Sequence, residues 1–474
     1  MKKFYTTTAI PYLNAAPHIG HAFEFVQADF ITRFQKALGK ETLLLSGGDE
    51  NAIKNVQAAE KAGVSIQDFI DKNAALFQDL AKQLHVQFDI FQRGSDQKNH
   101  FSSSQKLWKL CNKNGDIYKK DYTGLYCVGC EMFYPRDELD ENGECYEHPG
   151  KKLEEVSETN YFFKLSKYHN QIKKLIESDE LLVTPQKRKN ELLSFLKEPL
   201  KDISISRSNA RAKNWGVPVP GDDTQRIYVW FDALNIYQSG IGFGWDEKNY
   251  EKWWPADVHV IGKGITRFHA VYWPAFLLSA GLKLPKTVFV HGYLTIDGKK
   301  MSKSIGNVID PVGLIKKYGT DALRYYLLRE IPSTDDGDFS EHRMHEVYTS
   351  DLANELGNLL LRITHLAQLD GITADASNHE ELYDKELLAY FKTFEFHKTL
   401  ELIWQRLKKT NKSVDEFAPW KKTKNERKDF LVETLASINY IGTQLLPYLP
   451  DSAQKIIDST QGTIKKAPVL FPRL

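Results

Sequence analysis

Cysteine is scarce in this sequence, which has four in 474 residues. So few cysteines in so long a chain do not make a disulfide scaffold, and because three of them cluster, a metal site is the better interpretation. Long hydrophobic runs are also missing, since no apolar stretch approaches the roughly 18 residues that cross a bilayer. Three threonines at 6–8 and Pro11 interrupt the apolar core that a signal peptide would need. We therefore expect a cytoplasmic protein with no membrane contact.

The sequence also has no excess of positive or negative charge. Lysine and arginine number 63 against 62 aspartates and glutamates, a formal net charge of +1. No global field attracts a nucleic acid, so any RNA contact must depend on local patches. The composition is that of a globular protein, and the length suits roughly two to four domains with sizeable cores.

The stretch at residues 10–24 reads IPYLNAAPHIGHAFE and follows a β-rich run at 4–9. Its prolines require a turn, and apolar residues with helical spacing then predict a helix that begins near His18. The start of a helix presents unpaired backbone N–H groups and the positive end of the dipole, a seat for phosphate. Gly20 would let a ligand approach the backbone, and His18 and His21 lie on one helical face. Without further context, an ordinary helix start with two surface histidines explains the stretch equally well.

The first 111 residues alternate between strand and helix patterns. We expect strands at 41–45 and 86–91 and helices at 54–63, 66–84 and 97–115. Asp49 follows the first of these strands and a glycine turn, where α/β sheets bind ligands. It is a candidate for holding a cationic group such as an amine, and the N-cap of a helix from Ala52 onward is the alternative.

The clustered cysteines form the pattern C-x2-C-x14-C-x2-H, made by Cys127, Cys130, Cys145 and His148. Two short pairs bring four donors around one tetrahedral ion, and three thiolates with an imidazole suit zinc. The set has no open position, so the predicted role of zinc is structural. Two chance pairs of buried side chains are the alternative. Cys111 lies outside the pattern and is expected in the core.

The next block has the character of an insertion in an α/β domain. Its predicted elements are a strand at 161–165 and helices at 167–178 and 185–197. Strand–helix alternation then resumes with a strand at 226–232, a following helix that carries Tyr237, and a strand at 259–261. Large aromatic side chains near these strand ends suggest an apolar pocket with a few polar anchors, although core packing explains each of them singly.

The stretch at 297–304, DGKKMSKS, is polar and holds three lysines. This composition suits a mobile loop whose lysines neutralise charge that develops on phosphates. A solvated basic turn is the alternative, and it is less attractive beside the histidines at 18–21.

The last third of the sequence is helical in pattern. The predicted helices are 342–369, 380–408, 411–418, 424–446 and 450–459, with an extended end at 467–474. Helices with short connections form a bundle. Within it Trp420 precedes a basic run at 421–428, and an aromatic side chain flanked by cations is typical of single-stranded nucleic acid binding. A core tryptophan beside a solvated charged face is the alternative.

Two motifs now stand in one order, HIGH at 18–21 and KMSKS at 300–304, with the cysteine pattern between them. Together they resemble the class I aminoacyl-tRNA synthetases. Within that class the chain is similar to the methionyl-tRNA synthetase family, through IPY at 10–12, the Asp49 turn, VWFDA at 229–233 and RFHAVYW at 267–273. The resemblance runs from Phe4 to the end of the chain.

This resemblance implies an α/β fold: a Rossmann-type parallel-sheet catalytic domain with an inserted zinc-knuckle connective domain, followed by an all-α anticodon-binding bundle. The implied catalytic domain has two halves, 1–111 and 221–290, around a connective insertion at 112–220. A KMSKS loop and stem-contact region follows at 291–340, and the anticodon-binding domain covers 341–474. The short insertion lacks the large editing domain of the leucyl, isoleucyl and valyl enzymes.

The resemblance also implies a role for individual residues. The implied catalytic residues are His18, His21, Lys300 and Lys303. The implied ATP contacts are His18, Gly20, His21, Glu24, Gly262 and Lys303. The implied methionine site consists of Ile10, Tyr12, Asp49, Trp230, Ala233, Tyr237, Ile265, Phe268, His269 and Trp273. The anticodon would be read by Asn358, Arg362 and Trp420, and zinc held by Cys127, Cys130, Cys145 and His148.

The activity implied is ATP-dependent ligation of L-methionine to tRNA(Met) through a methionyl-adenylate, with Mg²⁺ accompanying ATP. A monomer is expected, since no appended tRNA-binding module follows the bundle. Three positions depart from the family pattern: Asn51-Ala52 replaces His-Gly, Gly264 replaces an Asp that contacts ribose, and the pocket-side helix reads Leu234-Asn-Ile-Tyr237. The alternatives are a cysteinyl enzyme, a catalytically silent paralogue that only binds tRNA, and a nucleotidyltransferase without tRNA.

Overall fold

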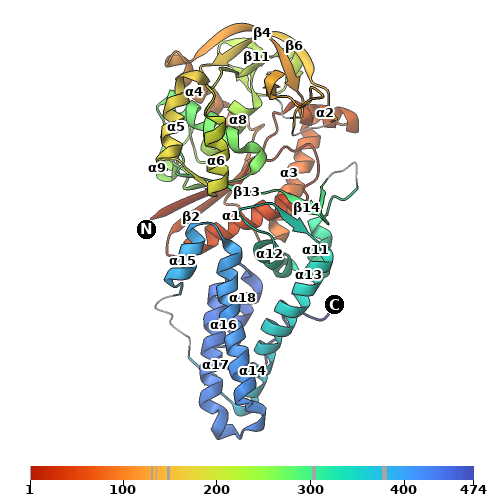
Figure 1. The fold of residues 1–474 in the computed structure, drawn as a ribbon, viewed down its shortest axis with the longest axis vertical. Helices are drawn as coiled ribbons and strands as arrows, with labels where there is room; N and C mark the ends of the chain where they lie inside the picture. Colours follow the sequence, from red (N-terminus) through yellow and green to blue (C-terminus); the bar gives the residue numbers. More distant parts are fainter. Residues whose placement is uncertain (1, 130–131, 135, 147–149, 302–305, 376–381) are drawn as a thin grey trace. The chain divides into compact units, whose positions relative to one another are not determined.

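The computed structural model describes residues 2–129, 132–134, 136–146, 150–301, 306–375 and 382–474. The chain divides into two compact units, traced in Figure 1. We call them the sheet unit, made of Met1–Pro17, Gly39–Asp79 and Gln87–Val290, and the helical unit, made of His18–Leu38, Leu80–Val86 and His291–Leu474. The chain therefore passes from one unit to the other several times.

A six-stranded sheet forms the centre of the sheet unit. Its strand order is β3 (Ile90–Arg93), β2 (Glu41–Gly48), β1 (Lys3–Thr7), β12 (Val258–Gly262), β13 (Thr287–His291) and β7 (Leu182–Thr184). The described pairings of β1 with β2 and β12, of β2 with β3, and of β13 with β7 are all parallel. β2 is buried from Leu43 to Gly48, as expected of a strand in a parallel sheet that helices cover on both faces. The predicted α/β class with a parallel sheet is confirmed.

The helices of this region bury a large aromatic core. They are α2 (Ile53–Ala62), α3 (Ile66–Gln83), α4 (His100–Lys113), α5 (His169–Glu177), α6 (Gln186–Phe195), α7 (Asn209–Ala212), α8 (Val229–Ser239), α9 (Glu247–Trp253) and α10 (Trp273–Ala280). Phe231 on α8 and Phe276 on α10 are both fully buried, with ring centroids 4.6 Å apart. The core therefore joins α8 and α10, which both lie in the second predicted half-domain.

Two small antiparallel sheets occupy much of the predicted insertion. One is ordered β5 (Met132–Tyr134), β4 (Ile117–Cys127), β6 (Glu154–Phe163) and β8 (Ile203–Ser204), and the other β10 (Pro218–Val219), β11 (Asp222–Ile227) and β9 (Ser206–Ser208). β7 lies in the same stretch of sequence but joins the parallel sheet. The domain boundaries drawn from the sequence stay a prediction.

The expected strand at 226–232 is wrong. β11 ends at Ile227 and pairs with β9 and β10 rather than with the parallel sheet, and α8 begins at Val229. Every residue of α8 is buried. Because α8 is buried on all sides, it has no exposed polar face, and its β-prone run Val229–Phe231 reads equally well as a strand. Tyr237 consequently lies on the same helix as Trp230.

The helical unit gathers the helix of the first motif with the last third of the chain. α1 (Ile19–Ala37) buries Phe34 in a stack on Phe391, with centroids 3.8 Å apart. Arg324 is fully buried and reaches the Asp29 carboxylate of α1 at 2.7 Å. The same guanidinium donates to the carbonyl of Tyr448 at 2.8 Å. α1 is thus tied to the C-terminal helices by aromatic packing and by a buried ion pair.

The remaining elements of this unit are mostly helices. They are β14 (Leu294–Ile296), β15 (Lys299–Lys300), α11 (Pro311–Tyr318), α12 (Thr320–Arg329), β16 (Gly337–Phe339), α13 (Glu341–Val347), the π-helix η5 (Tyr348–Gly357), α14 (Asn358–Asp370), β17 (Thr373–Ala374), α15 (Lys385–Lys392), α16 (Phe396–Phe417), η6 (Pro419–Lys421), α17 (Lys424–Leu445), α18 (Pro450–Ser459) and β18 (Gly462–Thr463). α17 packs against both α14 and α16, and Figure 1 shows the three side by side. The predicted helical bundle is confirmed.

The predicted division of this bundle at residues 409–410 is wrong. α16 continues through that point to Phe417, and the break falls instead at 393–395, between α15 and α16. Phe394 takes a positive φ of 60° there and is buried. Burial of this aromatic side chain outweighs the poor fit of its backbone conformation, which sequence patterns do not reveal. Among the described residues, no helix combines the length and apolar character needed to cross a membrane.

Candidate active site

The N-terminus of α1 is capped by the two histidines of the first motif. His18 is the N-cap, and its Nδ1 accepts a hydrogen bond from the Gly20 N–H at 3.1 Å. The Nδ1 of His21 accepts in turn from the His18 N–H at 3.1 Å. The two rings lie 4.0 Å apart. The predicted helix start near His18 is confirmed, and the two imidazoles are neighbours.

The expectation of unpaired backbone donors at this helix start is wrong. The Ile19 N–H donates to the Ile309 carbonyl at 3.2 Å, the Gly20 N–H to His18, and the His21 N–H to the His18 carbonyl at 2.9 Å. Because each Nδ1 acts as an acceptor, the proton of each neutral ring sits on Nε2. The first turn of α1 therefore presents two neighbouring imidazoles and the positive end of the helix dipole rather than a row of unpaired backbone amides.

The second motif begins close to the first. A Cβ placed on Gly20 would lie 3.0 Å from His18 Cε1 and 3.7 Å from Met301 Cε, so the missing side chain makes room for both. The backbone of Lys300 pairs with Thr295 in the hairpin of β14 and β15. Lys303 lies outside the described residues. The part of the second motif that the structure describes thus approaches the histidine turn.

Glu24, expected to contact ATP, is paired with a histidine that the sequence interpretation gave no role. Glu24 is buried, and its Oε2 lies 3.0 Å from His291 Nε2. His291 Nδ1 lies 2.8 Å from the Gly292 carbonyl, to which it donates. Glu24 is therefore held by a histidine on the buried side of α1.

Asp49 and Tyr12 meet through their backbones. The two residues form an isolated parallel bridge, and the Asp49 N–H donates to the Pro11 carbonyl at 2.9 Å. Asn55 donates to the Asp49 carbonyl at 2.7 Å. α2 begins at Ile53, and its N-cap is Ala52, without a side-chain cap. The alternative role for Asp49, as the N-cap of this helix, is therefore wrong. The chain after β1 and the chain after β2 run side by side here, and Ile10 lies on the first of them.

Aromatic residues from two helices build the wall of the candidate methionine pocket. Trp230 stacks on Phe268 with centroids 3.7 Å apart and planes 7° from parallel. Tyr12 meets the Trp230 ring edge-on at 6.3 Å, and His269 does so at 6.4 Å. A separation of 3.7 Å is van der Waals contact, so no ligand fits between Trp230 and Phe268, and Phe268 supports the indole. Ala233 is buried near them, and Ile265 packs partly exposed against the same core.

Tyr237 and His269 supply the polar contact of this wall. The hydroxyl of Tyr237 lies 2.8 Å from His269 Nε2, and His269 Nδ1 lies 3.0 Å from the Ile265 carbonyl. Since a carbonyl only accepts, Nδ1 carries the proton and Nε2 accepts from the tyrosine. Burial lowers the pKa of His269 to about 4, despite its bond to Ile265. The imidazole is neutral at physiological pH, so His269 adds no charge to the wall.

Behind Tyr237 lie residues that sequence reasoning missed. Tyr5 donates its hydroxyl to the Tyr237 carbonyl at 2.7 Å, and the His259 ring lies 4.4 Å from the Tyr237 ring. Thr7 Oγ1 lies 2.7 Å from His259 Nδ1, and burial lowers the pKa of His259 well below its usual range. Trp273 is fully buried beside them, as expected of a residue behind the pocket. Only the fold, which brings β1 beside β12, unites these positions.

The turn that follows β12 carries another departure from the family pattern. β12 ends at Gly262, and a single 3₁₀ turn, η3 (Lys263–Ile265), contains Gly264. A π-helix, η4 (Phe268–Tyr272), then continues into α10. π-helical turns occur often at functional sites, and this one carries Phe268 and His269.

Two of the four candidate zinc ligands lie together. The sulfurs of Cys127 and Cys145 are 3.2 Å apart, and both side chains are buried. This spacing is too long for a disulfide and is slightly less than the roughly 3.8 Å between thiolates on one tetrahedral zinc. Cys130 and His148 lie outside the described residues. Cys111 is buried elsewhere in the core, as predicted, and burial raises the pKa of its thiol to about 12.

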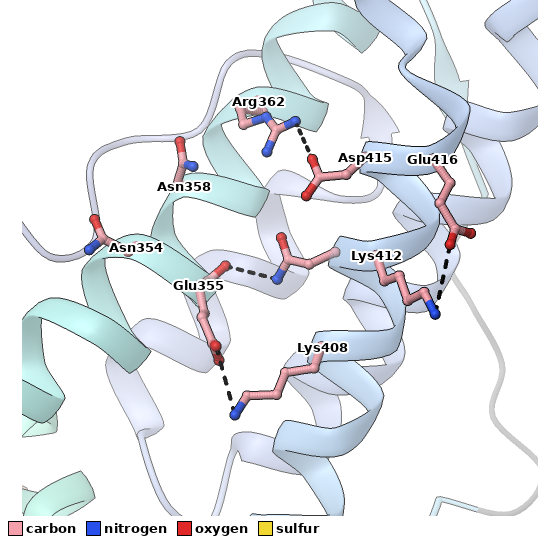
Figure 2. A pocket seen from close by; sticks show the side chains of 9 residues that line it. Asn354, Glu355, Asn358, Arg362, Lys408, Lys412, Asp415 and Glu416 are labelled. Atoms are coloured by element: carbon pink, nitrogen blue, oxygen red, sulfur yellow. Dashed lines mark hydrogen bonds and ion pairs between the residues drawn. The ribbon is translucent and has the colours of Figure 1, made fainter.

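The helical unit contains a pocket of about 660 Å³ between η5, α14 and α16. Figure 2 shows its two walls, with Asn354, Glu355, Asn358 and Arg362 on one side and Lys408, Lys412, Asp415 and Glu416 on the other. Three acidic and three basic side chains line it. Asn358 follows the π-helix η5 directly. Balanced charge around amide groups suits recognition of a neutral polar group such as a base edge.

Arg362 connects this pocket to Trp420. Its guanidinium pairs with Asp415 at 3.0 Å, as Figure 2 shows, and lies 4.7 Å from the Trp420 ring. Trp420 sits on η6 and is 46% exposed, so the alternative of a core tryptophan is wrong. The structure therefore brings Asn358, Arg362 and Trp420 to one place.

Comparisons with known proteins agree with this arrangement. A family model described as tRNA synthetases class I (M) matches residues 4–364. The chain is thus a class I aminoacyl-tRNA synthetase in fold and in motif order.

The relatives narrow the class further. A methionine–tRNA ligase of Thermotoga maritima is 41% identical over 472 residues, covering 96% of this chain and 74% of the relative. That of Clostridium acetobutylicum is 39% identical, covering 100% and 78%. A solved structure of Mycobacterium tuberculosis methionyl-tRNA synthetase in complex with methionyl-adenylate superposes with a TM-score of 0.91 at 37% identity, with both chains fully covered. The chain belongs to the methionyl-tRNA synthetase family.

Proposed function

We propose that this chain joins L-methionine to tRNA(Met) at the expense of ATP, through a methionyl-adenylate, for protein synthesis. The observation that carries the proposal is family membership over the full chain together with the aromatic, uncharged wall around Trp230. Methionine-dependent ATP–pyrophosphate exchange on the purified protein tests it, with the other nineteen amino acids as comparison. Exchange with cysteine instead, or none at all, would favour the cysteinyl enzyme or the silent tRNA-binding paralogue.

At the ATP end, the residues act through position and charge. The methionine carboxylate attacks the α-phosphorus in line, and pyrophosphate leaves. His18 and His21 hold phosphate oxygens through their Nε2 protons, and Lys300 and Lys303 neutralise the charge that develops on the leaving group. Bound Mg²⁺ would add further neutralisation of the triphosphate. Gly20, Glu24 and Gly262 are the further ATP contacts that the family resemblance implies.

At the methionine end, Asp49 and the Ile10 backbone hold the α-amino group, because Asp49 offers a buried carboxylate beside the chain that carries Ile10. Tyr12, Trp230, Ala233, Tyr237, Ile265 and His269 surround the thioether, with Phe268 and Trp273 behind them. Aromatic rings favour a sulfur at their edge by about 0.3–1.5 kcal/mol. A neutral wall also rejects charged side chains of similar length.

In the bundle, we expect Trp420 to stack on an anticodon base. Replacing Trp420 with alanine should lower tRNA(Met) aminoacylation about tenfold, since stacking is worth about 1–3 kcal/mol per base and 1.4 kcal/mol is tenfold. Methionine-dependent pyrophosphate exchange should stay at the wild-type rate. Aminoacylation and exchange measured on the same preparations check this, with Leu369→Ala on α14, 64% exposed, as control. A parallel loss of both activities would argue against a separate anticodon site.

A structural zinc would fit the buried pair Cys127 and Cys145, since two thiolates already lie within reach of one ion. Cys130 and His148 would complete its tetrahedron, and the ion would stabilise the fold around β4 without entering the reaction. We expect about one zinc per chain by metal analysis, and Cys127→Ser should lower both the zinc content and the unfolding temperature. Cys111→Ser is the matched control and should keep its zinc. Full zinc occupancy in Cys127→Ser would refute this ligand set.

We also propose that the enzyme acts as a monomer in the cytoplasm. Size-exclusion chromatography with light scattering on the purified chain would measure its mass directly. A stable dimer at micromolar concentration would contradict the first part of this proposal.

A further inference from the structure

Asp232 is a buried carboxylate that belongs to none of the roles assigned above. It lies on α8 beside Ala233 and two residues after Trp230, and it is 2% exposed. Its Oδ1 accepts from His100 Nε2 at 2.9 Å and from Ser104 Oγ at 2.7 Å. A buried carboxylate needs several donors, and α4 supplies two of them.

The third donor comes from the loop that carries Asp49. Asn51 Nδ2 lies 2.6 Å from Asp232 Oδ2 and 2.8 Å from the Gly94 carbonyl. Both partners only accept, so the amide must turn its NH₂ group toward them, with one hydrogen for each. The Asn51 amide is therefore the donor of this hydrogen bond, and the Asp232 carboxylate is its acceptor.

This bond joins the two sides of the methionine site. Asn51 stands two residues after Asp49, and Asp232 stands two residues after Trp230. The Asp49 backbone is itself fixed by its bonds with Pro11 and Asn55. If the Asn51 loop moved away from α8, the distance between Asp49 and Trp230 would therefore change. Asp49 is proposed to hold the amino group of methionine, and Trp230 its thioether.

We propose that Asn51 and Asp232 are positioning residues for methionine, whose hydrogen bond sets the span between Asp49 and Trp230. The inference rests on the proposed function of this site. Because the pair links the segments that carry Asp49 and Trp230, the residues proposed to hold the amino acid, it should govern binding of methionine and leave ATP binding unchanged. Loss of the bond should raise the KM for methionine selectively.

Asn51→Asp is the most informative variant. It places a second carboxylate against Asp232 Oδ2, and two carboxylates in contact cannot both be ionised, so one proton is shared at low pH. As pH rises and that proton leaves, repulsion opens the loop. The KM for methionine in this variant should therefore rise about tenfold between about pH 5.5 and 8.5, relative to wild type, while the KM for ATP stays constant.

Other ionisable groups face this pair and must be accounted for. His100 on α4 contacts Asp232, and next to Asn51 lies Glu50, bound by Arg93 and Ser95. Burial raises the pKa of Glu50, with Arg93 opposing the shift. These groups are present in wild type and variant alike, so the ratio of the two KM values at each pH isolates the new pair.

A swapped double variant separates positioning from general damage. In Asn51→Asp with Asp232→Asn, the amide sits on α8 and the carboxylate on the loop, so the bond between loop and α8 re-forms, while the bond to the Gly94 carbonyl is lost. The KM for methionine of the double variant should return close to the wild-type value, and it should no longer rise with pH. Asn439→Asp in the helical unit, a buried amide bonded to Thr460 Oγ1 at 2.9 Å, controls for the cost of burying a carboxylate and should leave both KM values unchanged.

Each result has one meaning. Wild-type protein without methionine-dependent exchange refutes the proposed function. Active wild type together with a pH-independent KM in Asn51→Asp, or with equal rises for methionine and ATP, refutes the positioning role alone. If Asn51→Asp does not fold, the swapped variant decides the question: a methionine KM raised tenfold despite the restored bond overturns the inference.

Discussion

Replacing His21 with alanine is expected to lower methionine-dependent ATP–pyrophosphate exchange by about 10²–10³-fold, the usual effect of losing one donor that stabilises developing charge. The ring of His21 lies 4.0 Å from that of His18, with its Nδ1 fixed by the His18 N–H, so its Nε2 proton has a defined place. Lys303→Ala, in the second motif, should cause a loss of the same order. The measurement is exchange at saturating methionine and ATP.

Two controls accompany this experiment. His342→Ala removes a histidine whose side chain is 84% exposed, and it should leave exchange unchanged. Since His21 also caps the His18 N–H, its loss should cost about 1 kcal/mol of stability, so circular dichroism must show that the variant is folded. Exchange within a few-fold of wild type in both His21→Ala and Lys303→Ala would overturn the assigned roles.

Trp230→Ala is expected to raise the KM for methionine about 30-fold and to change the KM for ATP little. Truncating a buried aromatic anchor costs about 2 kcal/mol or more of binding energy, and 1.4 kcal/mol is tenfold. Here the indole is supported by Phe268 at 3.7 Å and bordered by Tyr12 and His269, so its removal leaves a hole in the wall. Exchange kinetics with each substrate varied in turn measure both constants.

Trp245→Ala provides the matched control. Trp245 belongs to the same unit but is 44% exposed, and its indole N–H donates to the Ser239 carbonyl at 2.8 Å. Its loss should leave both KM values near wild type. Equal rises in the methionine and ATP constants of Trp230→Ala would mean that the pocket is misplaced.

Local patterns predicted the helix start at His18, the buried strand before Asp49 and the bundle of the last third, because each depends on periodicity or on turn residues. The start of α8 was misassigned because the helix is buried on all sides and has no exposed polar face to mark it. The break at Phe394 was missed because burial, not sequence pattern, stabilises its positive φ.

The candidate site shows the same division. Motif residues such as His18 and Asp49 could be found from spacing and resemblance. Asp232, His259 and His291 could not, because their partners stand more than a hundred positions away along the chain and only the fold unites them. Buried polar partners of this kind leave no periodic signal in a sequence.

The packing of α1 has a consequence for how this enzyme can be divided. Phe34 stacks on Phe391, and Asp29 depends on Arg324 for its counter-ion, so the helix that begins with the first motif folds against segments encoded in the last third of the gene. A fragment that ends at Val290 would keep the motif and lose the surface that buries its helix. Truncation after Val290 is therefore expected to unfold α1 and the histidine turn at its start.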